Sequence, residues 1–261
     1  MPTLLRILLI LTGIACVPSA ARAQFSFSDD EHAPQLRVGD QLIVNYFESD
    51  DELFTTYLVI TDHEGSGAVV NVMVHDDAGT LMDEQSFFLP IFGKVNYDPA
   101  LRLRGKKFSG TIRIFSDGGN VSAQYWHFYR DPSRSAFNTA IPAASATGGA
   151  ALLCQHVVSA PDIDARLILA NPSSDSAVTV SVTFYLDRGK QLTRDVHVVP
   201  PDGMLALDPY KENEGLVRTG LAYCEVVGNG VITGEYWQTS EKERYRVSLP
   251  LDIIPVRAKH W

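Results

Sequence analysis

The chain has 261 residues, enough for one large domain or two small ones, and 45% of them are hydrophobic, which argues against disorder. Its formal net charge is −9 with the histidines neutral, and it has no basic cluster. Such a chain is a poor partner for nucleic acid or an anionic membrane, because neutralising phosphates supplies most of that affinity.

Residues 1–23 have the features of a secretory signal peptide. A positively charged start leads into an apolar run at 7–17, too short to anchor in a bilayer, and Ala21-Arg22-Ala23 has the small-x-small cleavage pattern. We therefore expect an extracytoplasmic mature chain that begins at Gln24, in the periplasm or at the cell surface. The alternative is a lipoprotein modified on Cys16. No later segment is long and apolar enough to span a membrane, so we expect no membrane span in the mature chain.

The first predicted domain, 24–140, consists of short β-strands. Its apolar runs alternate with polar residues, and clusters of Gly, Asn, Asp and Ser mark turns between the runs. The strands predicted in this half are 41–47, 54–61, 68–75, 86–89, 111–115 and 121–129.

A linker at 141–148, rich in Ala, Gly, Ser and Thr, leads to the second predicted domain, 149–261. The clearest strand is 178–184, where the valines and the phenylalanine point to one face and the threonines and serine to the other. The other strands predicted in this half are 150–158, 165–170, 195–199, 221–227, 231–237 and 245–251.

The two halves align as copies of one unit. A shift of 109 residues, becoming 110 after the first turn, places 58–99 over 167–209, and every length change falls at a turn. The aligned pairs include Val70 with Val180, Pro90 with Pro200, Gly93 with Gly203, Asp98-Pro99 with Asp208-Pro209, and Tyr125-Trp126 with Tyr236-Trp237.

About seven short strands per copy, with no apolar stripe at helical spacing, predict an all-β fold. Two facing sheets are the usual way to bury such strands. The prediction is therefore two tandem antiparallel immunoglobulin-like β-sandwich domains arising from an internal duplication.

The second copy also resembles a known module. It runs through ILANPSSDSAVTVSVTFYLDRGK, VPPDG and GEYW and closes on LPLD. This order is similar to that of tandem β-sandwich modules of exported bacterial surface proteins and, more distantly, to the small-molecule-binding sandwich of the sensory rhodopsin transducer group. The first copy departs from it, with Thr61-Asp62-His63 for Ala-Asn-Pro and Pro90-Ile91 for Pro-Pro. The resemblance implies a fold and a compartment, and no chemistry.

Cys154 and Cys224 are the cysteines of the mature chain, and both lie in the second copy. In an oxidising compartment they could form a disulfide that closes a loop of about 70 residues, worth about 4 kcal/mol. The alternative is two buried free thiols, because the aligned residues Val44 and Ile114 are core types. No flanking motif activates either thiol for catalysis.

Motifs for catalysis, metals and cofactors are not recognisable. His63 and His75 have acidic neighbours but lie at predicted strand ends, and zinc and calcium-loop patterns are missing. A weak Ca²⁺ site at Asp50-Asp51-Glu52 stays open. Gly65-Ser66-Gly67 is typical of a turn and not of a nucleophile motif. We predict no catalytic residues, no metal and no cofactor.

Consecutive aromatic residues stand out at Tyr125-Trp126 and Tyr236-Trp237. On a strand such neighbours face opposite sides, so one of each pair should be buried. We expect Trp126 and Trp237 to be core anchors; the alternative is an exposed aromatic platform for a glycan or protein. The first copy has the denser run, and its predicted binding residues are Tyr125, His127 and Tyr129.

Three functions follow from these features. The leading hypothesis is a non-catalytic binding or structural module of the bacterial cell envelope, whose partner is an envelope protein or a glycan. The second is a periplasmic chaperone-like two-domain protein, although such chaperones use a basic pair between domains that the sequence does not reveal. The third is a polysaccharide-acting hydrolase. Fold alone does not choose among them.

Overall fold

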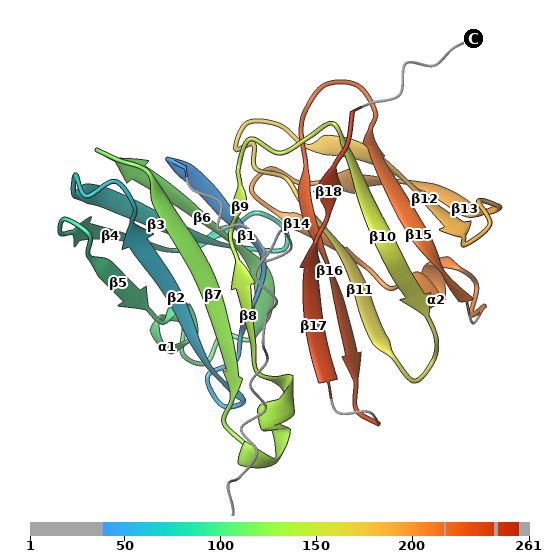
Figure 1. Cartoon of the computed structure of the whole chain (residues 1–261), viewed down its shortest axis with the longest axis horizontal. Coiled ribbons are helices and arrows are strands. Elements are labelled where there is room, and N and C mark those ends of the chain that lie inside the picture. Colours follow the sequence, from blue (N-terminus) through green and yellow to red (C-terminus); the bar gives the residue numbers. More distant parts are fainter. Residues whose placement is uncertain (1–38, 217, 243–244, 256–261) are drawn as a thin grey trace, which may run out of the picture. The chain divides into compact units, whose positions relative to one another are not determined.

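The computed structural model describes residues 39–216, 218–242 and 245–255 (Figure 1). The predicted signal peptide, 1–23, and Cys16 lie outside the described residues. The strands of the first half are β1 (Gln41–Ser49), β2 (Phe54–Asp62), β3 (Ala68–Asp76), β4 (Leu81–Leu89), β5 (Lys94–Tyr97), β6 (Phe108–Asp117), β7 (Val121–Tyr129), β8 (Thr139–Pro142) and β9 (Ala144–Ser145).

These strands form two antiparallel sheets, in the orders β4-β3-β6-β1-β9 and β5-β2-β7-β8. Strand β3 illustrates how burial alternates along these strands. Its residues Ala68, Val70, Val72 and Val74 are buried, whereas Val69 is 44% exposed. This alternation gives each sheet one inward face. Inward side chains of both sheets share one buried core, so the half is sandwich-like.

The second half repeats the same orders, as β13-β12-β15-β10-β18 and β14-β11-β16-β17. A bulge in β1 between Val44 and Phe47 has a counterpart in β10 between Cys154 and Val157. The strands of this half are β10 (Ala151–Ser159), β11 (Asp164–Ala170), β12 (Val178–Leu186), β13 (Gln191–Val199), β14 (Met204–Leu207), β15 (Arg218–Val226), β16 (Thr233–Ser240), β17 (Tyr245–Pro250) and β18 (Asp252–Ile253).

Strand β12 is more enclosed than its alternation predicts. Ser181 and Thr183 are buried on the face expected to be wet. The strand lies between β13 and β15, and the Arg194 Nε donates to the Ser181 hydroxyl at 2.9 Å. A central strand can therefore bury small hydroxyl side chains once a neighbouring long side chain covers them.

The predicted linker at 141–148 contains parts of two strands. Strand β8 pairs with β7, and β9 pairs with β1, so this segment adds an edge strand to each sheet of the first half. Ile141 and Ala143 are buried. Its small residues fit a chain that crosses closely from one sheet to the other. Composition predicted a linker here, whereas residues 141–145 belong to the sheets of the first half.

Short α-helices begin at the prolines of the two aligned Asp-Pro pairs. In α1 (Pro99–Arg102) the Asp98 carboxylate accepts from the Leu101 amide at 2.9 Å, and in α2 (Pro209–Glu212) Asp208 accepts from Tyr210 at 3.0 Å. An Asp N-cap with Pro in the first turn is a strong helix start. A 3₁₀ helix, η1 (Pro132–Phe137), connects β7 to β8.

The described residues belong to one compact unit. One buried core cluster combines first-half residues with Ile168, Ala170, Met204 and Trp237 of the second half. The two halves therefore share apolar packing. Across the described ranges, we find no helix with the length and apolar character to cross a bilayer.

Candidate functional site

The predicted binding residues lie together, but on the inward face of β7. The rings of Tyr125 and His127 are 6.2 Å apart, and those of His127 and Tyr129 are 5.4 Å apart. Tyr125 is 0% exposed and His127 is 1% exposed, and only Tyr129 is partly exposed. The three share a face, as period two requires, yet that face packs inward, so the exposed aromatic strip is not formed and its prediction as a docking surface is corrected.

The predicted core anchors differ from each other. Trp126 is half-buried on the outward face of β7, where it stacks on Phe128 with ring centres 5.8 Å apart. Trp237 is 3% exposed and packs edge-on against Tyr46 of the first half, at 5.2 Å. Trp237 is therefore an anchor between the halves, and Trp126 is not a core anchor.

The buried aromatics common to both halves are tyrosines. The Tyr125 hydroxyl accepts from the Glu48 amide at 3.3 Å, and the Tyr236 hydroxyl accepts from the Val158 amide at 2.9 Å. Glu48 and Val158 follow the equivalent bulges of β1 and β10. These hydroxyls satisfy amides at corresponding places, which explains the paired tyrosines structurally.

Cys154 and Cys224 are both buried free thiols. In the β10–β15 register Cys154 lies opposite Ala222, and Cys224 lies opposite Leu152, so the two cysteines are diagonal neighbours. Diagonal positions are about 7–8 Å apart, beyond the usual reach of a disulfide. Burial raises the pKa of Cys154 to about 12, which leaves no reactive thiolate.

A polar cluster centred on Arg246 of β17 lies between the halves. Its guanidinium donates to the Tyr129 hydroxyl at 3.2 Å, lies 3.5 Å from Glu48 Oε2 and sits over the Trp237 ring, 4.1 Å from the ring centre. Burial and the charge of Arg246 lower the pKa of His127 to about 3. His127 and Tyr129 are thus internal partners of Arg246.

Beside this cluster is a cleft of about 370 Å³ that contains charged side chains from both halves. Glu48 faces Arg246, and Arg134 pairs with Glu241. The cleft is therefore polar: each of its two arginines faces a carboxylate, and two further carboxylates, Asp162 and Asp164, also line it.

Glu235 of β16 is a buried carboxyl close to the same contact, 2% exposed. The Trp237 indole N–H donates to its Oε1, and the Thr233 hydroxyl donates to the Asn45 Oδ1 at 2.6 Å nearby. Burial raises the pKa of Glu235 to about 7, against the hydrogen bonds from Trp237 and Asn45, which lower it. Such a pKa marks candidate functional carboxyls, but Glu235 does not line the cleft.

The Pro200-Pro201-Asp202-Gly203 corner of the second half docks on the outer face of the first half's five-stranded sheet. The Asp202 carboxylate pairs with Arg113, and the Thr111 hydroxyl donates to the Asp202 carbonyl at 2.6 Å. His75 Nε2 lies 3.9 Å from the Asp202 carboxylate. A methyl group on Gly79 would overlap the Pro201 carbonyl, so Gly79 permits this close approach.

The equivalent outer face of the second half carries an apolar groove of about 510 Å³. Leu221, Tyr223 and Tyr185 stand where the first half has Thr111, Arg113 and His75. A methyl group on Gly189, the counterpart of Gly79, would meet no atom within 4 Å. This groove is our candidate functional site. Its lining residues are Leu153, Tyr185, Gly189, Leu221, Tyr223, Glu225 and Ile254.

Sequence reasoning missed this groove because its residues alternate with core residues on ordinary strands. The signal was present in the aligned copies, where Thr111, Arg113 and His75 of one face become Leu221, Tyr223 and Tyr185 of the other. Outward positions that are polar in one half and apolar in the other therefore give the two equivalent faces different surface chemistry.

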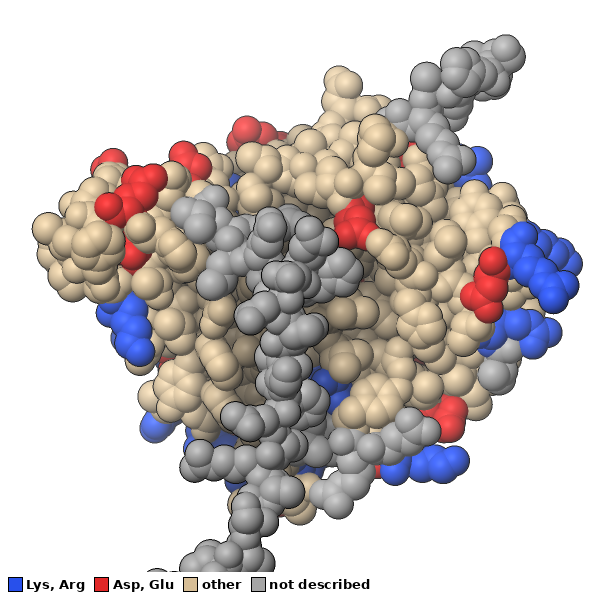
Figure 2. Space-filling view, viewed as in Figure 1, with Lys and Arg blue, Asp and Glu red and all other residues tan. Residues whose placement is uncertain are grey.

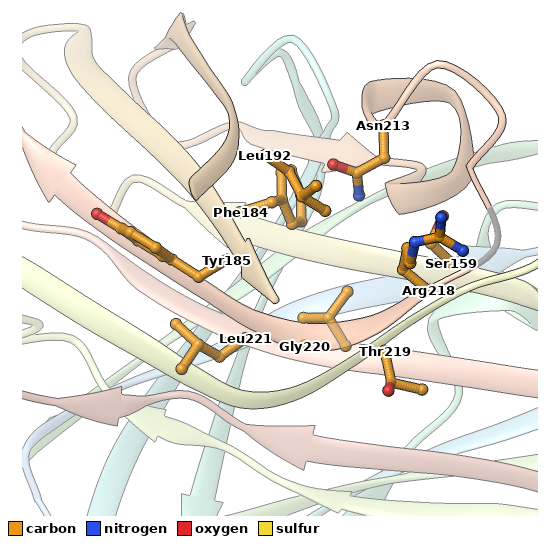
Figure 3. A pocket seen from close by; sticks show the side chains of 10 residues that line it. Ser159, Phe184, Tyr185, Leu192, Asn213, Arg218, Thr219, Gly220 and Leu221 are labelled. Carbon is orange, nitrogen blue, oxygen red and sulfur yellow. The ribbon is translucent and has the colours of Figure 1, made fainter. Parts of the chain in front are cut away.

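Other places among the described residues offer less room. The pocket in Figure 3, beside Phe184, Leu192 and Asn213, has about 10 Å³, which is roughly the space of one water. Asp50 accepts from the Glu52 amide at 3.1 Å and pairs with Lys107 at 3.4 Å, so these acidic groups serve a turn. Within the described residues, no three His, Cys, Asp or Glu side chains gather as metal ligands.

Charged side chains lie mainly toward the edges of the face drawn in Figure 2, and uncharged surface occupies much of the rest. Several Lys and Arg side chains lie together at the right edge of that face, beside an acidic side chain.

Comparisons with known proteins give little. No protein-family model matches the chain, and no curated protein matches it significantly. Among solved structures, the apo form of Pleurotus Ostreatus Lectin is similar over 83% of this chain and 82% of its own, with 11% identity and a TM-score of 0.15. A likeness at that level carries no argument about fold or function.

Proposed function

We propose that this chain is an exported, non-catalytic binding or structural module of the bacterial cell envelope. It would comprise two tandem immunoglobulin-like sandwiches derived from one duplicated unit. The shared sheet orders, the matching bulges and the paired tyrosine hydroxyls support the duplication. The signal-like N-terminus supports export.

The observation that carries the binding proposal is the groove on the outer face of β10, β12 and β15. Its first-half counterpart is filled by the Asp202 corner, while Gly189 at the second-half position has open space above it. An apolar surface groove edged by tyrosines is a typical protein- or glycan-binding surface. We assign the envelope partner to this groove.

Two titratable groups with altered pKa values, Glu235 and His127, support a non-catalytic function through the contacts they already make. Glu235 accepts from the Trp237 indole, and His127 lies against Arg246 and Phe54, whose ring centre is 4.0 Å away. A general acid or base needs access to its substrate. These two side chains are enclosed, and their burial explains their pKa values.

The chaperone-like alternative would use a basic pair between the halves. Arg134 and Arg246 both line the cleft there. Each already faces a carboxylate, Glu241 and Glu48 respectively. A partner's carboxylate would have to displace these internal ones, so this alternative is weaker than the groove.

The test compares capture of envelope components by the wild-type mature chain, Tyr223→Arg and the control Leu101→Arg. Leu101 is 43% exposed on α1, in the other half. We expect Tyr223→Arg to lose a captured component that Leu101→Arg retains. Equal capture by both variants would remove the groove from the proposal, and turnover of a glycan, peptide or ester by the pure protein would overturn its non-catalytic part.

A further inference from the structure

The polar cleft beside Arg246 is a candidate site that is separate from the groove. Its volume of about 370 Å³ lies within the range of small-molecule sites in proteins. The side chains that line it come from both halves, and none of them also lines the groove. Most small-molecule sites are lined mainly by apolar side chains, whereas charged side chains predominate in this one. A ligand for the cleft must therefore be hydrophilic.

Four carboxylates supply the cleft with hydrogen-bond acceptors. They belong to Glu48, Asp162, Asp164 and Glu241. The Glu48 Oε1 accepts from the Tyr46 hydroxyl at 2.5 Å, and the Asp164 Oδ1 lies 3.3 Å from the Arg166 Nε. Asp162 is exposed and has no side-chain hydrogen bond or ion pair with another described residue. Its carboxylate is therefore available to the hydrogen-bond donors of a ligand.

One hydrogen-bond donor at the cleft lacks an acceptor. The Arg246 side chain lines the cleft and is 7% exposed. Its Nη1 donates to the Tyr129 hydroxyl at 3.2 Å, and its Nη2 lies 3.5 Å from the Glu48 carboxylate. The Nε–H is buried and has no hydrogen-bond partner in the part of the chain that the structure describes. A buried donor without an acceptor is costly, so an oxygen supplied by a ligand would complete this site.

Contacts around the cleft already hold its polar groups in position. The Tyr129 ring packs edge-on against Phe54, with ring centres 4.9 Å apart, and Arg134 lies over the same ring, 4.6 Å from its centre. Arg246 sits over the Trp237 ring. Groups fixed in this way lose little conformational freedom on binding. Because the rings are engaged in these contacts, we expect recognition in the cleft to depend on hydrogen bonds rather than on stacking.

The mixture of donors and acceptors selects the class of ligand. An anion would face four carboxylates, and both arginines of the cleft already face a carboxylate. An ammonium ion would be attracted, but it has no acceptor to offer the Arg246 Nε. A hydroxyl group both donates and accepts, so one hydroxyl can donate to Asp162 while a neighbouring oxygen accepts from Arg246. Several neighbouring hydroxyls on one ring are the defining feature of a sugar.

We propose that this cleft binds a neutral sugar residue of a glycan, with one hydroxyl donating to the Asp162 carboxylate and a neighbouring oxygen accepting from the Arg246 Nε. The site gives the chain a second ligand, beyond the partner assigned to the groove. Since the cleft and the groove share no lining residue, either assignment can fail without the other.

Binding is measured on the mature protein by ligand-observed NMR, with neutral trisaccharides of glucose, galactose, mannose and N-acetylglucosamine as probes. Trigalacturonic acid and spermidine serve as the anionic and the cationic probe. We expect saturation transfer from the protein to at least one neutral trisaccharide. Its dissociation constant should change less than about twofold between about 0.05 and 0.5 M NaCl, because salt screens interactions between charges and the sugar has none.

Asp162→Ala should weaken binding of that trisaccharide by at least about tenfold, because it removes a charged acceptor. The matched control is Asp117→Ala, since Asp117 is an exposed aspartate that lines neither the cleft nor the groove. This control and Tyr223→Arg should bind the sugar as the wild type does. The thermal melt of Asp162→Ala should be unchanged, because the Asp162 side chain makes no described polar contact.

Arg246→Lys tests the donor. Lysine keeps a positive charge near Glu48 but has a methylene group in place of the Nε–H, so sugar binding should again fall by at least about tenfold. Arg246 also contacts Trp237 between the halves. If this variant melts at a lower temperature, the Asp162→Ala result decides.

Sugar binding that Asp162→Ala weakens and Asp117→Ala retains supports the proposal. Equal binding by both variants would place the sugar elsewhere on the protein and overturn it. Failure of every neutral trisaccharide to bind would overturn it too. So would salt-sensitive binding of spermidine or trigalacturonic acid in place of the neutral sugars, since the cleft would then recognise a charge.

Discussion

The outer faces of the two five-stranded sheets share one architecture and differ in what covers them. On the first half, His75, Thr111 and Arg113 meet the Asp202 corner and are nearly inaccessible. On the second half, Leu221 and Tyr223 line an apolar groove at the same strand positions. Two halves with the same strand orders need similar core residues, so the difference between their outward residues is the feature that distinguishes their surfaces.

The largest expected difference concerns the aligned tryptophans. Trp237→Ala should lower the free energy of unfolding by about 4 kcal/mol, because it empties a buried contact between the halves. Trp126→Ala should cost about 1 kcal/mol, since the ring is half-buried beside Phe128. Chemical denaturation measures both. Similar costs for the two variants would break the distinction between an inter-half anchor and a surface stack.

A second comparison sets Glu235 against Gln124, its counterpart on β7. Glu235 has a pKa of about 7 in the folded protein, above its ordinary value of 4.5. The stability that this raised pKa contributes is complete below about pH 4.5 and is lost as the pH rises to about 7. Glu235→Gln removes this pH dependence. We expect the difference in the free energy of unfolding, variant minus wild type, to be about 3 kcal/mol larger at pH 8 than at pH 4. Denaturation at both pH values tests this, and a pH-independent difference would contradict it.

Gly79 and Gly189 give a matched pair for the two faces. Both have positive φ, 84° and 76°, so an alanine at either should cost about 1 kcal/mol in backbone strain. Gly79→Ala also collides with the Pro201 carbonyl, whereas Gly189→Ala enters open space. We expect Gly79→Ala to be less stable by about 2 kcal/mol. Equal melting temperatures would mean that the corner is not seated on the first half.

The smallest expected effect tests what the halves share. Tyr125→Phe and Tyr236→Phe each remove a hydroxyl that accepts one backbone amide, of Glu48 and Val158 respectively. Each should cost about 1 kcal/mol, the usual loss for one hydrogen bond. Chemical denaturation measures both variants. A large loss of unfolding free energy for one variant and none for the other would show that the two buried hydroxyls have different roles.

Most of the strands were predictable because their apolar residues alternate. The range 121–129 coincides with β7, and 54–61 differs from β2 by one residue. The short strands β5 and β14 were missed, since four residues leave too little periodicity to recognise. Local pattern identifies long half-buried strands well and short edge strands poorly.

The candidate site was less predictable, for a physical reason. Period two placed Tyr125, His127 and Tyr129 correctly on one face, but it cannot say which face is inward when both carry aromatic side chains. Nor can it show that Asp202 reaches Arg113, because that contact joins residues far apart in the sequence. Which surface is covered depends on tertiary contacts between the halves.

The crossing segment β8–β9 has a practical consequence for dividing the chain. A fragment that ends at residue 140 would lose β9 and half of β8, and so leave the edge of β1 and part of the edge of β7 unpaired. Unpaired edges of this kind recruit other strands and aggregate. The natural place to cut is the turn at Thr147-Gly148, after both edge strands are complete. An isolated first half should therefore include residues 141–147, although their composition predicts a linker.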